Sequence, residues 1–288
     1  MAALDVGIDA AIGSEVRGRP LGMVTWMAAG WLLLVIAAAL LADLLPLDSP
    51  TDMDMLGRRL PPGAEHWLGT DALGRDVLSR LVFGARVSLT IGVASALIGL
   101  GLGGTIGLLA GYFRGRLESL AMAGIDVLLA FPPLVLVLAV TACLGLSVFN
   151  LTVTIGILSI PPFARVARAA TSSLAQRDFV TAARALGATD TRILLRELLP
   201  NVLLPLVAFF LLAVAVTIVV EGALSLLGLG VPPPQPSWGS MIGEGRDSLE
   251  IAPWLAFLPA GAMFLTVLSF NFVGDRLRAL TDPRPGAL

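Results

Sequence analysis

Six long apolar stretches alternate with polar segments along this chain of 288 residues. A helix needs about 20 predominantly apolar residues to cross the hydrocarbon core of a bilayer, and each stretch is long enough for one crossing. The pattern therefore predicts an all-α integral membrane protein with six transmembrane helices. The predicted spans are 21–45, 87–112, 119–143, 149–170, 201–229 and 252–274.

The composition agrees with a membrane protein. Hydrophobic residues make up 56% of the chain and charged residues only 14%, with a mean hydropathy of +0.88. These values are outside the range of ordinary soluble domains. The first stretch is too long for the apolar part of a cleaved signal peptide and is followed by further spans, so we expect it to remain as a transmembrane helix.

Arginine is distributed unevenly between the two predicted sides. All 19 basic residues are Arg, and 13 of them lie in the two terminal segments, in alternate loops and at the end of the fourth span. The positive-inside rule then places both termini and the long loop before the fifth span in the cytoplasm, and segment 46–86 outside. The terminal segments are 1–20 and 275–288. The 13 residues are Arg17, Arg19, Arg114, Arg116, Arg165, Arg168, Arg177, Arg184, Arg192, Arg196, Arg276, Arg278 and Arg284.

Glycine recurs every four residues in the second span, at Gly99, Gly103, Gly107 and Gly111. This spacing places the four residues on one helix face, and a face of small residues lets another backbone approach closely. We expect the face to seat against another helix, either within this chain or in a second subunit.

The chain has few residues suited to catalysis. A phosphate-binding loop of the usual type is excluded because there is no Lys, so energy for any work must come from a partner. The single His66 lies in a polar loop and the single Cys143 in an apolar run, which excludes a disulfide framework and a His/Cys metal cluster. A net charge of −2 indicates no basic surface for nucleic acid. We expect no catalytic residue, metal site or cofactor on this chain.

The polar segment before the fifth span predicts two short helices joined by a tight turn. Ala182 and Ala183 are strong helix formers, and Gly187 can take the left-handed conformation that ends a helix. Thr189, or the Asp after it, can cap a second helix that runs to Pro200. The small side chains suit a helix that approaches a partner's surface closely.

This segment resembles the cytoplasmic loop of ABC importer permeases, whose Glu-Ala-Ala, Gly and Leu-Pro motif docks its first helix into a groove on the ATPase subunit. The chain departs from the motif at Thr181, where the family usually has Glu. Segments 66–89, 224–239 and 271–284 resemble the C-type permease of dipeptide, oligopeptide and nickel importers, so the resemblance extends from the first span to Pro283. The residues that it assigns to ATPase coupling are Thr181, Ala182, Ala183, Arg184, Gly187, Leu199 and Pro200.

The resemblance implies a type I importer permease with a core of five helices over 87–274, which includes a coupling loop at 171–200. It implies ATP-driven import of dipeptides or oligopeptides across the cytoplasmic (inner) membrane by alternating access. It also implies a homologous second permease, an extracytoplasmic solute-binding protein, and two ABC ATPase subunits that bind ATP and Mg. One alternative is the import of nickel, haem or another small solute. The other alternative is a membrane scaffold that recruits a soluble protein.

Two acids, Asp126 and Glu221, lie well inside predicted spans, where an ionised group costs several kcal/mol unless it meets water or a partner. For Asp126 we expect a pair with an Arg near the cytoplasmic surface. Glu221 either lines the translocation path or caps or packs at the outer end of its span, and Asn271 is a weaker candidate for the path. Because the two acids belong to different spans and opposite ends, we expect no catalytic pair.

Two segments on the predicted outer side have physical signatures of their own. Residues 71–80 lead into an apolar run and predict an amphipathic helix along the outer surface, with a solvated connecting loop as the alternative. The proline-rich residues 232–236 predict a stiff, extended outer loop. Docking of a solute receptor at this loop is what the resemblance implies.

Overall fold

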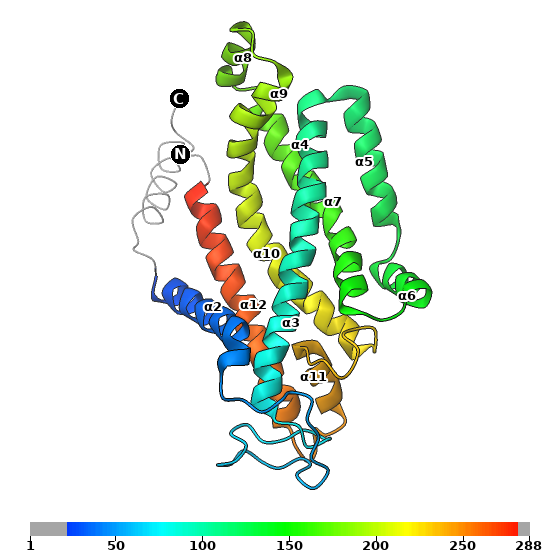
Figure 1. The fold of residues 1–288 in the computed structure, drawn as a ribbon. Helices are drawn as coiled ribbons and strands as arrows, with labels where there is room; N and C mark the ends of the chain where they lie inside the picture. Colours follow the sequence, from blue (N-terminus) through cyan, green and yellow to red (C-terminus); the bar gives the residue numbers. More distant parts are fainter. Residues whose placement is uncertain (1–21, 282–288) are drawn as a thin grey trace, which may run out of the picture.

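The computed structural model describes residues 22–281, which form a bundle of helices with no β-strand among them (Figure 1). Five helices are long and apolar enough to cross a membrane, and six when the bent pair α5 and α6 counts as one span. The predicted all-α membrane fold is confirmed. Segment 1–20 and the end of the predicted C-terminal tail lie outside the described residues.

Short 3₁₀ and π segments join several of the α-helices. The α-helices are α2 (Met23–Leu41), α3 (Val77–Ile98), α4 (Gly104–Phe113), α5 (Gly115–Ala130), α6 (Pro133–Leu144), α7 (Val148–Leu174), α8 (Asp178–Ala185), α9 (Asp190–Arg192), α10 (Leu199–Leu226), α11 (Trp238–Arg246) and α12 (Trp254–Thr281). A 3₁₀ turn at Ala42–Leu44 extends α2, and π segments at Gly99–Gly103 and Ile193–Leu198 join α3 to α4 and α9 to α10.

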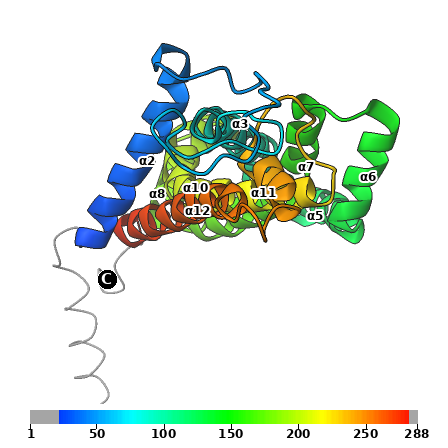
Figure 2. The ribbon, with the colours of Figure 1, turned by 90° about the horizontal axis from the view of Figure 1, so that it is seen from below.

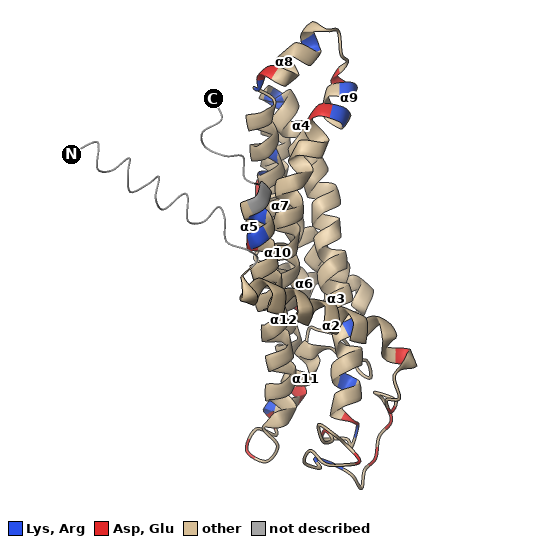
Figure 3. Cartoon of the chain, turned by 90° about the vertical axis from the view of Figure 1, so that its left-hand side faces the viewer, with Lys and Arg blue, Asp and Glu red and all other residues tan. Residues whose placement is uncertain are grey.

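The bundle has two polar ends and an apolar middle. Charged residues concentrate around α8 and α9 at one end and in the loops at the other, with few along the helices between them (Figure 3). Seen along the bundle, α2 and α6 lie at opposite edges, with α3, α10 and α12 between them (Figure 2). This arrangement is the one expected of a protein that spans a bilayer.

The predicted third span, 119–143, is not one straight helix. It is divided into α5 and α6, which are bent by 79° relative to each other. A proline disfavours helical geometry in the residue before it, and Phe131 and Pro132 accordingly take extended conformations. The two prolines, 132 and 133, interrupt the apolar pattern here, so the predicted third span is a bent pair of helices.

The fifth span is longer than predicted. A nearly continuous helix runs over Asp190–Leu226, so the second helix of the coupling segment does not stop at Pro200 as expected. Proline has no N–H to donate and its ring crowds the preceding turn. The π segment Ile193–Leu198 widens the helical turn just before Pro200, and the helix continues past the proline.

The glycine face of the second span packs against α7 within this chain. A Cβ added to Gly103 would lie 2.3 Å from the carbonyl oxygen of Ile160, and one added to Gly107 would lie 2.2 Å from that of Ala164. No larger residue fits at these distances. The expectation of a seating face is confirmed, and α7 is the helix that it contacts.

The prediction of a surface helix over 71–80 is wrong, because α3 begins only at Val77. Asp71 instead accepts hydrogen bonds from the backbone of a tight turn, including the N–H of Arg75 at 3.0 Å. Gly74 in this turn has φ +79°, and a Cβ there would lie 1.7 Å from the carbonyl oxygen of Asp54. Residues 77–86, assigned to the outer loop from the sequence, are therefore part of α3.

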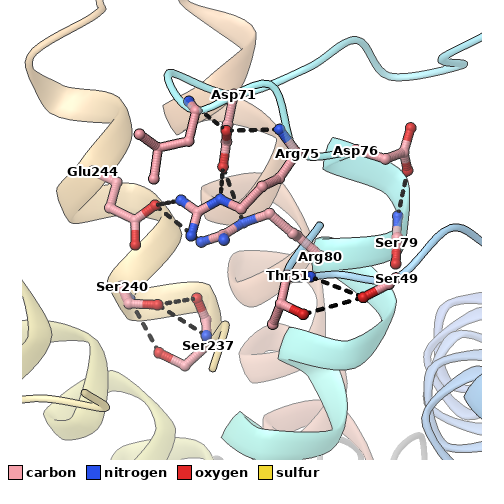
Figure 4. A network of polar contacts seen from close by, with 11 residues as sticks. Ser49, Thr51, Asp71, Arg75, Asp76, Ser79, Arg80, Ser237, Ser240 and Glu244 are labelled. Atoms are coloured by element: carbon pink, nitrogen blue, oxygen red, sulfur yellow. Dashed lines mark hydrogen bonds and ion pairs between the residues drawn. The ribbon is translucent and has the colours of Figure 1, made fainter. Parts of the chain in front are cut away.

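An ion network with two buried arginines fixes this turn to α11 (Figure 4). Asp71 pairs with Arg75 at 2.6 Å and with Arg80 at 3.3 Å. Both arginines also reach Glu244 on α11, at 2.6 and 2.9 Å. Because buried charges are tolerated only when they are paired, these contacts account for the polar sequence of the segment.

The proline-rich segment between α10 and α11 is also less regular than expected. Pro233 and Pro234 lie in a turn, so the uniformly extended chain predicted for 232–236 is wrong. The segment ends at Ser237, whose hydroxyl accepts the N–H of Ser240 at 3.0 Å and caps α11.

Candidate functional site

The predicted coupling segment forms a protruding loop at one end of the bundle, with α8 at its tip (Figure 1). Val180 of α8 is fully buried and belongs to one apolar cluster with Ile193 and Leu198 of the π segment. This contact holds α8 against the start of the fifth span. The loop is therefore a folded unit and not a free connector.

The turn after α8 has the hydrogen bonds of a Schellman motif. Gly187 has φ +79°, its N–H donates to the carbonyl of Arg184 at 3.0 Å, and the N–H of Ala188 donates to that of Ala183 at 3.0 Å. The predicted left-handed glycine is confirmed. Of the two candidate caps for the next helix, Thr189 is the one whose side chain accepts an N–H.

A second tie joins the loop to α4 and was not predicted from the sequence. The Tyr112 hydroxyl donates to Asp190 at 2.5 Å and accepts a hydrogen bond from Arg184 at 3.2 Å. This hydrogen bond to the Tyr112 oxygen raises the pKa of Arg184 above its usual value. A lone Tyr at the end of an apolar span was the available signal, but its partners are 72 and 78 residues away in sequence.

The predicted coupling residues divide between an outward face and an inward face. Thr181 and Ala182 are exposed, and the neighbouring Leu186 is 89% exposed. Ala183 is half-buried and packs on the apolar cluster of this chain, so it does not share their outward position. Leu199 is half-buried, whereas Arg184, Gly187 and Pro200 are exposed. The outward face is thus small and apolar around Ala182.

Glu221 lies fully buried where α10 meets α3 and the start of α11. One carboxylate oxygen accepts hydrogen bonds from Ser225 and Ser237, both at 2.8 Å. The other accepts from Ser88 at 3.3 Å, and Ser88 in turn accepts the N–H of Trp238 at 3.1 Å. The carboxylate therefore joins three helices, and its place on a translocation path stays a prediction.

Asn271, the weaker candidate for the path, is half-buried on α12. Its side-chain amide donates to the carbonyl of Val267 in the same helix, at 2.7 Å. This bond satisfies one donor of the amide locally. The structure does not bring Asn271 into contact with Glu221 through any described hydrogen bond, and a role for Asn271 on the path also stays a prediction.

Asp126 has the arginine partner expected from the sequence. Its carboxylate lies 2.9 Å from the Arg165 guanidinium of α7. Glu118, two turns earlier on α5, pairs with Arg168. Within the described part of the chain, the hydrogen-bond partners of Glu221 are serines, so the two acids have separate partners and are not paired with each other.

Asp48, His66 and Asp76 are the one group of possible metal ligands that converges within the described residues, with their ligand atoms within 4.8 Å of one another. Both oxygens of Asp76 already have partners, because one accepts the N–H of Ser79 at 2.7 Å and the other lies 3.0 Å from His66 Nδ1. The arrangement closes the loop onto the start of α3, and we assign no metal to it.

A bundle of long apolar helices that carries a folded, exposed loop at one polar end defines a multi-pass helical membrane protein. Residues 103–286 match the family described as "Binding-protein-dependent transport system inner membrane component", and the chain belongs to this family. It is therefore a permease subunit of an ABC importer in the inner membrane.

Two curated relatives cover most of the chain. The chain is 44% identical over 260 residues to the glutathione transport system permease protein GsiD of Pectobacterium atrosepticum, covering 90% of this chain and 86% of the relative. It is 43% identical over 253 residues to GsiD of Escherichia coli O157:H7, covering 88% and 84%.

Solved structures support the fold. A chain from a crystal form of the MetNI methionine ABC transporter in inward-facing conformations has a TM-score of 0.58 to this structure, covering 71% of this chain and 97% of that one. The two sequences are 19% identical, so this likeness concerns the fold alone.

Proposed function

We propose that this permease subunit moves small peptides through its importer by alternating access. Its relatives named GsiD belong to transport systems for glutathione, which is itself a small peptide. Their similarity covers 90% of this chain. The same relatives favour a peptide over nickel or haem as the solute.

The observation that carries the mechanism is the anchoring of α8. This helix exposes small residues on one face, while Val180 on the other face is buried against the beginning of the fifth span. The fifth span then continues to Leu226, and the bond from Tyr112 to Asp190 adds a tie to α4. A displacement of α8 by a partner would thus be transmitted to two spans, as rocking between inward and outward openings requires.

We propose that the partners of this chain are two ABC ATPase subunits, a second permease and an extracytoplasmic solute-binding protein. ATP and Mg would bind on the ATPases, since this chain has no Lys for a phosphate-binding loop. The excess of Arg favours a cytoplasmic position for both termini and for segment 171–200. The polar loops at the opposite end would face the solute-binding protein.

Reconstitution of the complete importer in vesicles tests this proposal. We expect a peptide, presented with the solute-binding protein, to stimulate ATP hydrolysis and to accumulate inside the vesicles. A membrane scaffold would give neither signal. Accumulation of nickel or haem, with no response to peptides, would contradict the peptide assignment while leaving the importer mechanism in place.

A further inference from the structure

A polar cavity of about 520 Å³ lies between α5 and α7, away from the coupling loop and from Glu221. We call it the α5–α7 cavity. Its lining contains the two ion pairs Asp126–Arg165 and Glu118–Arg168, one partner of each pair on each helix. The remaining lining residues are Gly115, Ser119 and Met122. All of its charged groups therefore face each other across the gap between two membrane helices.

Two of the four charged groups of this cavity, Asp126 and Arg165, are exposed although they lie in spanning segments. The side chain of Asp126 is 65% exposed and that of Arg165 is 57% exposed. Arg165 belongs to a complete candidate span, and Asp126 to the first half of the bent one, roughly 16 Å along α5 from its first residue. Ionised groups at such positions face a water-filled space or a protein partner, because exposure to lipid costs several kcal/mol.

The other side of α5 has the opposite character. Leu120 is 75% exposed and Val127 is 61% exposed, and neither lines the cavity. Ile125 is buried and packs with Ile160 and Ala164 of α7. The helix thus separates an apolar surface, suited to lipid or to an apolar partner, from a polar surface suited to water.

The chemistry of the cavity matches a zwitterion. It offers two carboxylates for an ammonium group and two guanidinium groups for a carboxylate, and its net charge is zero. Arg168 Nε is buried and has no hydrogen-bond acceptor among the described residues, so this guanidinium meets the cavity through its terminal nitrogens, one of which pairs with Glu118. A volume of about 520 Å³ is within the range of pockets that hold small ligands.

We propose that the α5–α7 cavity is a water-filled part of the translocation path and binds zwitterionic solutes, such as the free ends of a small peptide, by exchanging its internal ion pairs for pairs with the solute. This inference rests on the proposed function. Exchange of one ion pair for another keeps each charge compensated, so the solute can bind and leave without stranding a charge in the membrane.

The test measures thiol labelling in the assembled importer, in vesicles and in a Cys143→Ser background that removes the native, exposed thiol. Ser119→Cys places a thiol in the cavity, and Leu120→Cys, one residue later, places one on the apolar side. With a charged, water-soluble thiol reagent that has access to both sides, we expect Ser119→Cys to react at least about tenfold faster than Leu120→Cys, since the reagent does not partition into lipid. Equal or reversed rates would overturn the water-filled path.

Protection of the thiol from labelling tests which ligand binds in the cavity. This result does not depend on which solutes the solute-binding protein selects. Dialanine should slow labelling of Ser119→Cys, whereas N-acetyl-dialanine, which lacks the ammonium group, should protect less. Asp126→Asn should remove this difference between the two compounds, when each labelling rate is taken relative to that of the same variant without either compound. No protection by dialanine, or an unchanged difference in Asp126→Asn, would contradict zwitterion binding in the cavity.

These outcomes are distinct from failure of the proposed function. If the importer accumulates peptides but Ser119→Cys resists the reagent, the cavity is not on the path and the peptide importer stands. If Ser119→Cys is labelled and protected by dialanine but no peptide is accumulated, the cavity stands and the assignment of peptides as the imported solute fails.

Discussion

Replacement of Glu221 decides whether this residue joins helices or lines the path. Its carboxylate accepts hydrogen bonds from three serine hydroxyls on α3, on α10 and at the start of α11, and it is fully buried. Glu221→Ala would remove both acceptor oxygens, and with them all three hydrogen bonds, at once. Glu221→Gln is the matched control, because its amide oxygen can still accept two hydroxyls and its volume is nearly unchanged.

The expected loss of stability follows from the donors left without an acceptor. A buried polar group that loses its partner costs about 1–3 kcal/mol. The Ser225 hydroxyl can turn to the backbone carbonyl four residues earlier, which leaves those of Ser88 and Ser237 uncompensated. Glu221→Ala should therefore lower the free energy of unfolding by about 2–6 kcal/mol, and Glu221→Gln by less than about 1.5 kcal/mol.

Thermal unfolding of the purified complex in detergent provides the assay, followed by the fluorescence of buried tryptophan, which includes Trp238 next to the Glu221 network. We expect Glu221→Ala to lower the apparent midpoint on the order of 5–15 °C and Glu221→Gln to remain close to the unchanged protein. A Glu221→Ala variant that is as stable as the unchanged protein but fails to transport would refute the reasoning and place Glu221 on the path.

Two further predictions concern topology and packing. In a Cys143→Ser background, Gln235→Cys should react with an impermeant thiol reagent in intact cells, whereas Thr189→Cys should react only after the membrane is opened. Labelling of Thr189→Cys in intact cells would contradict the proposed orientation. Gly103→Ala places a Cβ against the α7 backbone, 2.3 Å from its nearest atom, and should reduce stability by about 1–3 kcal/mol in thermal unfolding. Gly101→Ala, where a Cβ meets nothing within 4 Å, should be neutral or stabilising, and equal losses in both variants would contradict close packing of this face.

The spans and the coupling loop could be predicted because their signals are local. Apolar length alone locates the crossing helices, and Gly187 marks the helix end that the Schellman bonds then form. The glycine repeat likewise predicts a close helix contact. Which helix it contacts could not be predicted, because the distance between Gly103 and Ile160 depends on the packing of the whole bundle.

The error at residues 71–80 and the undetected division of the coupling residues have a common physical cause, which is that distant contacts outweighed a local pattern. Residues 71–80 look amphipathic, but the Arg75 and Arg80 side chains are directed to Glu244, more than 160 residues later, and the chain turns to reach it. Ala182 and Ala183 are indistinguishable by sequence, and only the buried cluster around Val180 separates an outward residue from an inward one. The candidate site was thus predicted as a segment but not as a surface.

This distinction changes how docking of α8 has to be tested. Ala183→Asp would bring a charge to the chain's own apolar cluster and destabilise the loop even if no ATPase docked there. Ala182 is exposed, so a change at this position reports on the partner. Gly187→Val is a separate probe, because a β-branched residue at φ +79° opposes the turn that holds the loop.

The most direct test of the account is co-purification of the ATPase subunits, with substrate-stimulated ATP hydrolysis, for Ala182→Asp and for the matched control Thr181→Glu. Both changes add one acidic side chain to neighbouring exposed positions of α8, and the control introduces the residue usual in related importers. We expect Ala182→Asp to lose both signals, because a charge buried unpaired in a docking groove costs a few kcal/mol, and Thr181→Glu to keep them. Normal assembly and stimulated hydrolysis in Ala182→Asp would contradict the claim that this face of α8 couples the permease to its ATPases.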